Sequence, residues 1–118
     1  MSTLNVSNIT DGTDTVETTY VISGSAKLQH RYNQSTNTVN DSINVSSTTD
    51  VSTGTYDLSY TNSFDNANYR MGGSSDNGYT VQFYTSPAPT VSSSRIITWF
   101  SAYSDRQYNS VFMDGDLA

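Results

Sequence analysis

The sequence has no cysteine, which excludes disulfide bonds, a thiolate nucleophile and a cysteine-type zinc site. Positive charge is scarce: five lysines and arginines are scattered among eleven acidic residues, and the net charge is −6. Nucleic acids and anionic membrane surfaces are bound by clusters of positive charge. The composition therefore argues against both as partners.

Long apolar runs are also missing. No stretch approaches the roughly 18 residues of a membrane-spanning helix, so we expect no membrane insertion. The first residues carry neither the basic nor the apolar region of a secretory signal. Together with the missing disulfides, this predicts a protein that folds in a reducing cytoplasm.

Hydrophobic residues make up only 34% of the chain and charged residues only 14%, so the surface must be solvated mainly by hydroxyl and amide groups. The nine tyrosines supply large amphipathic side chains that supplement the few aliphatic residues. A core this thin predicts that the chain completes its burial against copies of itself.

The clearest structural signal is the alternation of Tyr56, Leu58 and Tyr60 with polar residues, which is typical of a half-buried β-strand. Helix signals are essentially absent, and 46–54 reads as a polar loop. Trp99 lies in the most apolar segment, which predicts a core position. Similar patterns predict strands near 26–32, 39–45, 55–61, 67–71, 79–85, 95–103 and 108–113. The sequence thus predicts an all-β chain, with an antiparallel β-sandwich or barrel-like body over 26–118.

Residues 1–25 are predicted to form an extended N-terminal attachment arm. The strong turn signal at Asp11-Gly12 interrupts two weakly alternating runs. Their apolar residues are too few to form a core of their own, so they must dock on another surface. The expected attachment or interface residues are Leu4, Val6, Ile9, Val16, Tyr20, Val21 and Ile22.

Catalytic chemistry finds little support in the sequence. His30 is the only histidine, and no recognisable nucleophile or second ligand accompanies it, so it is interpreted as a partly buried strand residue with a hydrogen-bond partner. Most aspartates lie in predicted turns, where carboxylates cap backbone N–H groups. Calcium held by Asp114 and Asp116 from several chains is an open alternative on a weak signal. We expect no enzyme activity, no resident metal and no cofactor.

Tyr84, Tyr103 and Tyr108 are the best candidates for outward-facing aromatic residues. Contacts between subunits are the favoured interpretation because tyrosine is enriched at interfaces. The alternative from another functional class is a carbohydrate-binding module, which predicts an exposed row of aromatic residues with affinity for a sugar.

Several ordered motifs span nearly the whole chain. They are Met-Ser-Thr-Leu-Asn-Val-Ser-Asn-Ile at 1–9, Gly-Ser-Ala-Lys at 24–27, Asp-Ser-Ile-Asn-Val-Ser-Ser at 41–47, Thr-Gly-Thr-Tyr-Asp-Leu at 53–58, Phe-Asp-Asn-Ala-Asn-Tyr at 64–69 and Val-Phe-Met-Asp-Gly-Asp at 111–116. In this order they resemble the small β domain found repeatedly in predicted tail-fibre and related appendage proteins of marine bacteriophages. Common members carry a Trp and a Phe in the strand after Ala-Lys, where this chain has Leu-Gln-His-Arg-Tyr. The resemblance therefore implies a shared fold and carries no ligand over.

What the resemblance implies is a non-catalytic virion structural protein, assembled in the host cytoplasm and attached by its N-terminal arm. The expected partners are two further copies in a homotrimer, other virion proteins of the tail or capsid, and a host cell-surface glycan. A capsid decoration protein, of the head-fibre or cement type, is the alternative. No catalytic residue is carried over, because the family has none.

Overall fold

Strand β6 (Thr55–Tyr60) lies at the centre of the fold in the computed structural model, which describes residues 2–118. Tyr56, Leu58 and Tyr60 are buried, while Asp57 and Ser59 on the opposite face are partly exposed. This is the alternation that the sequence predicts. Neighbouring strands then cover both edges of β6.

Two antiparallel sheets form the body. The first sheet has the order β5-β6-β9, with β8 on the far edge of β9 and β10 on the same edge of β9 as β6. The second sheet has the order β4-β3-β11-β7. The strands of the first sheet besides β6 are β5 (Val45–Ser52), β8 (Thr80–Phe83), β9 (Ser93–Phe100) and β10 (Ala102–Tyr103). Those of the second are β3 (Ala26–Asn33), β4 (Thr38–Ile43), β7 (Arg70–Ser74) and β11 (Asn109–Asp114).

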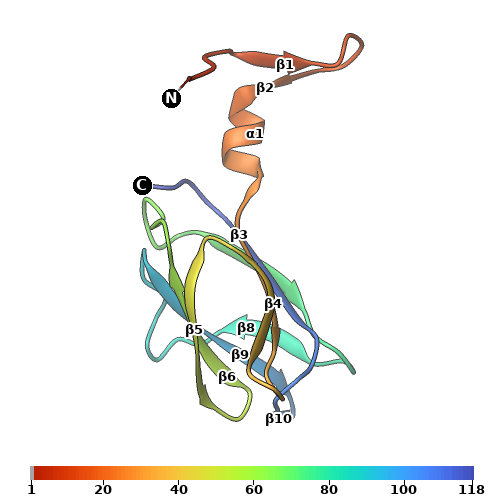
Figure 1. The fold of residues 1–118 in the computed structure, drawn as a ribbon, viewed down its shortest axis with the longest axis vertical. Coiled ribbons are helices and arrows are strands. Elements are labelled where there is room, and N and C mark those ends of the chain that lie inside the picture. The colour runs from red at the N-terminus through yellow and green to blue at the C-terminus, as the bar shows by residue number, and fades with distance from the viewer. Residues whose placement is uncertain (1) are drawn as a thin grey trace.

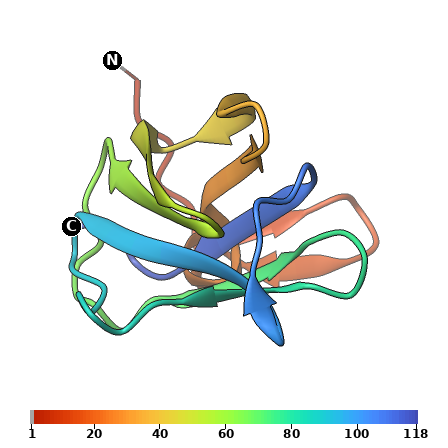
Figure 2. The same cartoon turned by 90° about the horizontal axis from the view of Figure 1, so that it is seen from below.

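The sheets face each other across one core, and Figure 2 shows the strands arranged around it. The chain passes from one sheet to the other at Asn44, whose positive φ of 62° bends it between β4 and β5. The predicted all-β sandwich is confirmed. The buried cluster is rich in tyrosine and consists of Leu28, Tyr32, Tyr56, Leu58, Tyr60, Phe64, Tyr69, Ile96, Val111 and Met113.

Two secondary-structure predictions for the body are wrong. The polar stretch predicted as a loop over 46–54 is mostly strand β5, because it pairs along the free edge of β6 and needs no apolar side chains to do so. The strand predicted at 67–71 instead runs over 70–74. It includes Gly72 and Gly73 because β7 pairs closely with β11.

The N-terminal segment, residues 2–25, is not the extended arm that the sequence predicts. Strands β1 (Asn8–Thr10) and β2 (Thr15–Glu17) form a hairpin, and helix α1 (Thr18–Gly24) leads into β3. The turn expected at Asp11-Gly12 is present, and Gly12 has a φ of 101°. The helix is rich in β-branched residues, which favour strands, so its composition does not explain why it is helical. Figure 1 shows the hairpin and helix standing clear of the body, which gives a molecule of 49 × 28 × 24 Å.

A buried polar network joins the two sheets at the end of the body away from the N-terminal segment. The side-chain oxygen of Gln34 accepts hydrogen bonds from Asn109 Nδ2 at 2.8 Å and from the backbone N–H of Arg106 at 3.2 Å. The hydroxyl of Thr98 lies 3.0 Å from the same oxygen and 2.6 Å from the Ser104 carbonyl, either of which can accept its single proton. Asn109 belongs to the second sheet and Thr98 to the first, so the network couples them.

Replacing Asn109 with alanine should lower the free energy of unfolding by about 2 kcal/mol, because a buried acceptor loses a partner. Urea unfolding followed by far-UV circular dichroism measures the change. Gln107→Ala, at an exposed position two residues away, is the control and should stay within roughly 0.5 kcal/mol of the parent. Equal unfolding midpoints for the parent and Asn109→Ala would contradict a stabilising role for the network.

Candidate functional site

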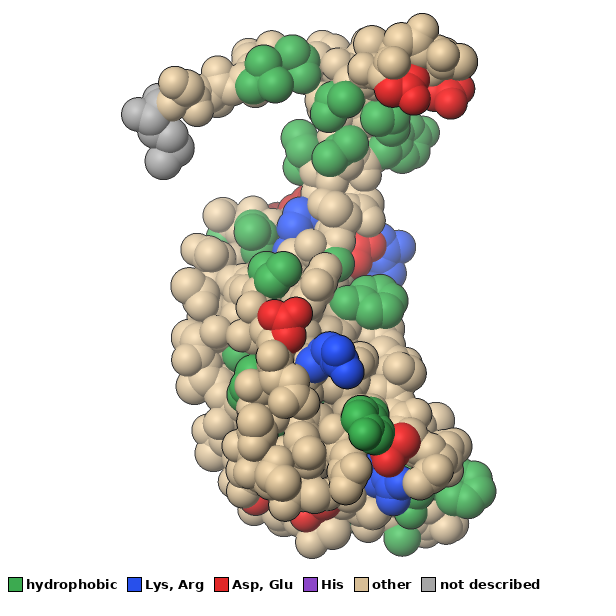
Figure 3. Space-filling view, turned by 45° about the vertical axis from the view of Figure 1, so that its right-hand side comes forward, with side chains coloured by type: hydrophobic (Ala, Val, Ile, Leu, Met, Phe, Trp, Pro, Cys, Tyr) green, Lys and Arg blue, Asp and Glu red, His purple; other side chains and the backbone are tan. Residues whose placement is uncertain are grey.

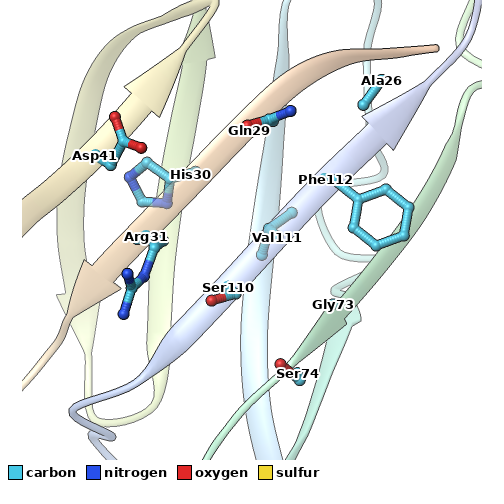
Figure 4. Close-up of a pocket in the computed structure, with 10 residues that line it drawn as sticks. All are labelled: Ala26, Gln29, His30, Arg31, Asp41, Gly73, Ser74, Ser110, Val111 and Phe112. Carbon is cyan, nitrogen blue, oxygen red and sulfur yellow. The ribbon is translucent and has the colours of Figure 1, made fainter.

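A shallow groove of about 460 Å³ crosses the outer face of the second sheet, over β3, β11 and β7 (Figure 4). Cross-strand pairing builds it. Arg31 lies opposite Asp41 on one side and Ser110 on the other, and Ser110 lies opposite Ser74. Cross-strand partners point to the same face of a sheet, so these four side chains form one polar row.

The aromatic wall of the groove is Phe112. Its ring lies over Gly72, its partner on β7, so closely that a Cβ added to Gly72 would come within 2.3 Å of the ring. Gly72 therefore serves a close approach of side chain to backbone. Gln29, the partner of Phe112 on β3, continues this row.

His30 borders the groove only through its strand, because its side chain points into the core and is 1% exposed. Its Nε2 lies 2.8 Å from Thr48 Oγ1 on β5, while Nδ1 has no partner. We assign the proton to Nε2, since an unpaired lone pair costs less than an unpaired buried N–H. Burial lowers the pKa of His30 from 6.5 to about 4. The predicted strand position and hydrogen-bond partner of His30 are confirmed, but the residue is fully buried and not partly buried as predicted.

The groove has side chains that can bind a ligand, but few that can take part in catalysis. It offers a guanidinium, a carboxylate, an amide and hydroxyls beside one phenyl ring, whereas its only imidazole is turned into the core. Acid–base or nucleophilic catalysis needs a nucleophile and a base within hydrogen-bond reach. Among the described residues, no hydrogen bond joins a nucleophile to a base in this groove.

The three tyrosines predicted to face outward do not form one site. Tyr84 and Tyr103 both lie on the outer face of the first sheet: Tyr103 pairs with Trp99, and the Tyr84 N–H donates to the Arg95 carbonyl. Tyr103 is 43% exposed and Tyr84 partly exposed. Tyr108, also exposed, precedes β11 in the second sheet.

Trp99 is not a core residue, so that prediction is wrong. It is 38% exposed and packs edge-to-face on Tyr103, with ring centroids 4.8 Å apart. The apolar segment is buried on both faces only over 96–98, and β9 extends beyond the core at its C-terminal end. An unbroken apolar run does not show how far the opposing sheet covers the strand. Only the position of that sheet decides this.

The N-terminal segment presents a second groove, of about 440 Å³, between the start of the chain and helix α1. The Thr18 N–H donates to the Ser7 carbonyl and closes its base. All seven predicted attachment residues are exposed, Leu4 most of all at 83%. The structure brings five of them together along this groove, Leu4, Val6, Ile9, Val21 and Ile22, whereas Val16 and Tyr20 lie outside it.

Several acidic residues have defined partners in turns or ion pairs. Asp11 accepts hydrogen bonds from the backbone N–H groups of Thr13 and Asp14, and these lower its pKa, as expected for a turn aspartate. Arg106 forms a two-bond ion pair with Asp76 and lowers the pKa of that carboxyl. Arg70 pairs with Asp114 at 2.7 Å. Within residues 2–118 no three His, Cys, Asp or Glu side chains gather as a metal-binding group.

Gln29 and Arg31 alternate with buried residues of β3, and the sequence gives no sign of the groove that they border. Its other side comes from Phe112, Ser110 and Ser74, more than forty residues away along the chain. Strand register, which brings them together, has no local signal in the sequence.

No family model, curated protein or solved structure matches this chain. No helix in the described chain is long and apolar enough to cross a membrane.

The buried His30 should make stability pH-dependent. Between pH 6.5 and about 4 the unfolded chain binds a proton on His30 that the folded chain does not, so acidification through this window lowers the free energy of unfolding, by about 3 kcal/mol in all. Urea unfolding at intervals from pH 7 to 4.5 measures the slope. His30→Gln should flatten it, because it removes the titrating group. An unchanged slope in His30→Gln would show that other groups cause the dependence.

The exposure of Trp99, the only tryptophan, can be measured directly. Acrylamide should quench its fluorescence in the native protein to an extent between that of the urea-unfolded chain and that of a fully buried indole. Trp99→Ala should cost about 1–2 kcal/mol in urea unfolding, below the roughly 3–5 kcal/mol of a buried aromatic side chain. Native fluorescence that acrylamide does not quench would contradict this placement.

Proposed function

We propose that this protein is a non-catalytic structural protein of a bacteriophage virion, of the tail-fibre or appendage type. It attaches through its N-terminal segment and displays the β-sandwich at the particle surface. The observation that carries the proposal is the apolar groove on a segment that stands clear of the body.

This groove needs a partner. Hydrophobic side chains gather on the N-terminal segment in the space-filling view (Figure 3). The five that line the groove are all exposed, although burying each would be worth about 1.5–3 kcal/mol. Uncovered apolar surface of this kind is typical of a contact with another protein.

The first occupant of the groove is the same segment of sister chains. Projecting from one end of an elongated molecule, the segments of three copies can meet around a common axis while their bodies stay apart. Such a homotrimer offsets the thin aliphatic core of each chain. It also gathers three net charges of −6, whose repulsion salt should ease.

The virion assignment itself depends on the ordered motifs that resemble appendage proteins of marine bacteriophages. A protein that decorates the capsid would use the same attachment, and its location in the particle distinguishes the two. A carbohydrate-binding module is the second candidate function. The exposed pair of Trp99 and Tyr103 favours it, and the two functions are compatible in one chain.

A double substitution, Leu4→Asp with Ile22→Asp, should convert the trimer to a monomer because it places two charges in the apolar groove. Sedimentation equilibrium measures the mass, expected near three times 12.9 kDa for the parent. Tyr20→Asp is the matched control, since Tyr20 lies on the same segment, exposed but outside the groove. It should remain trimeric.

The attachment is tested in the virion. Deletion of residues 2–22 should abolish incorporation into purified particles, measured by mass spectrometry of their proteins, while circular dichroism still reports a β body. Normal incorporation of the deletion protein would overturn the proposal. A parent protein that sediments as a monomer at all practical concentrations would overturn the trimer.

A further inference from the structure

The outer face of the first sheet carries two regular rows of side chains on either side of Ile97. Near the β9–β10 turn, Trp99 lies between Thr80 on β8 and Tyr103 on β10. Four residues away, Arg95 lies between Asp57 on β6 and the position of Tyr84 beyond β8. At roughly 3.3 Å per residue the two rows are about 13 Å apart along β9. We call this surface the Trp99 face.

In the middle row, Ile97 lies between Thr55 and Gln82 and is 9% exposed, although it points away from the core. The aromatic rings of Trp99 and Tyr103 meet edge-to-face at 72°. Gly54, with a φ of 67°, supports them from behind: a Cβ there would come within 3.0 Å of Tyr103 Cβ.

The polar groups of the face are already held in place. Arg95 forms two hydrogen bonds with Asp57, at 2.7 and 2.9 Å. Gln82 Nε2 donates to Thr80 Oγ1 at 2.8 Å, and that hydroxyl donates to the Trp99 carbonyl at 3.1 Å. The carbonyl oxygen of the Gln82 side chain accepts from no described residue. Such preorganisation reduces the entropy that a ligand must overcome on binding.

We infer that the Trp99 face binds a neutral carbohydrate chain. A sugar ring has an apolar C–H face that stacks on an aromatic ring, and hydroxyls at its rim that hydrogen-bond to amides, carboxylates and guanidinium groups. The face offers both in sequence along β9: the rings of Trp99 and Tyr103, then the amide of Gln82, then the Arg95–Asp57 pair. The site therefore suits a short oligosaccharide segment lying along the strand.

Charge argues against acidic polysaccharides, which resemble neutral ones in shape. The one cation of the face is neutralised by Asp57, and the chain as a whole carries −6, so an acidic polysaccharide is repelled. A stable protein interface buries about 800 Å² on each partner around an apolar core. Here exposed amide and hydroxyl groups separate the aromatic pair from Tyr84.

The position of the face fits the proposed function, on which its biological role rests. The β9–β10 turn lies at the end of the body opposite the N-terminal segment (Figure 1). Attachment at one end leaves the Trp99 face pointing outward. The binding itself is a property of the full chain and can be tested without any particle.

The test is affinity electrophoresis of the full-length protein through gels containing neutral polysaccharides, with mannan, laminarin, xyloglucan and hydroxyethyl cellulose in separate gels. At least one should retard the parent protein. Trp99→Ala and Tyr103→Ala should each weaken that retardation at least tenfold, judged from its dependence on polysaccharide concentration. Phe112→Ala, which removes an exposed aromatic side chain from the opposite sheet, is the matched control and should bind like the parent.

Four results of the electrophoresis experiment would overturn the inference. They are no retardation in any of the neutral gels, undiminished binding by Trp99→Ala with a native β spectrum, loss of binding in Phe112→Ala instead, and stronger retardation by polygalacturonate than by every neutral polymer. A drop in sedimenting mass caused by Trp99→Ala would assign the face to contacts between copies and would also overturn it. The groove variant Leu4→Asp with Ile22→Asp should still bind the polysaccharide, so a failure of attachment and a failure of sugar binding are distinguished.

Discussion

The buried hydrogen-bond network around Gln34 fixes how the two sheets pack against each other. Each sheet contributes one side chain, Thr98 from the first and Asn109 from the second, and the loop before β11 contributes backbone groups. All three side chains are excluded from water, so each group that loses its partner incurs the full desolvation cost. This requirement fixes how β9, β11 and the 104–107 loop meet, and thereby where β9 extends past the core to expose Trp99.

The core contains tyrosines where many proteins have aliphatic residues. The surroundings of each buried hydroxyl therefore differ. Tyr60 and Tyr69 meet at 2.8 Å through their hydroxyls, and Tyr69 donates to the Thr90 carbonyl. Burial raises the pKa of both. The buried hydroxyl of Tyr56 has no partner, although its ring packs against Tyr32. The core therefore relies on ring packing as well as directional hydrogen bonds, and both restrict the strands to one arrangement.

Besides the groove beside Phe112, two uncovered surfaces remain once this core is complete, and they lie at opposite ends of the molecule. The groove of the N-terminal segment is lined mainly by apolar side chains, with Thr3, Asn5 and Thr18 among them. On the Trp99 face, by contrast, rings alternate with fixed amide and charged groups. Apolar surface alone favours another protein, whereas the mixed surface favours a ligand that is itself both apolar and hydroxylated. The proposed division into an attaching end and a displaying end follows from this difference.

The sequence by itself determined the all-β class, the inward face of β6 and the hydrogen-bonded strand role of His30, because side-chain alternation is a local property of a strand. It also pointed to the apolar residues of the N-terminal segment. It could not determine that the polar stretch after Asn44 is strand β5, that residues 18–24 are helical, or that Gln34 is buried. Those outcomes, the groove beside Phe112 and the exposure of Trp99 depend on which strands pair and where one sheet stops covering the other. Pairing joins residues far apart in the chain, so only the tertiary structure decides it.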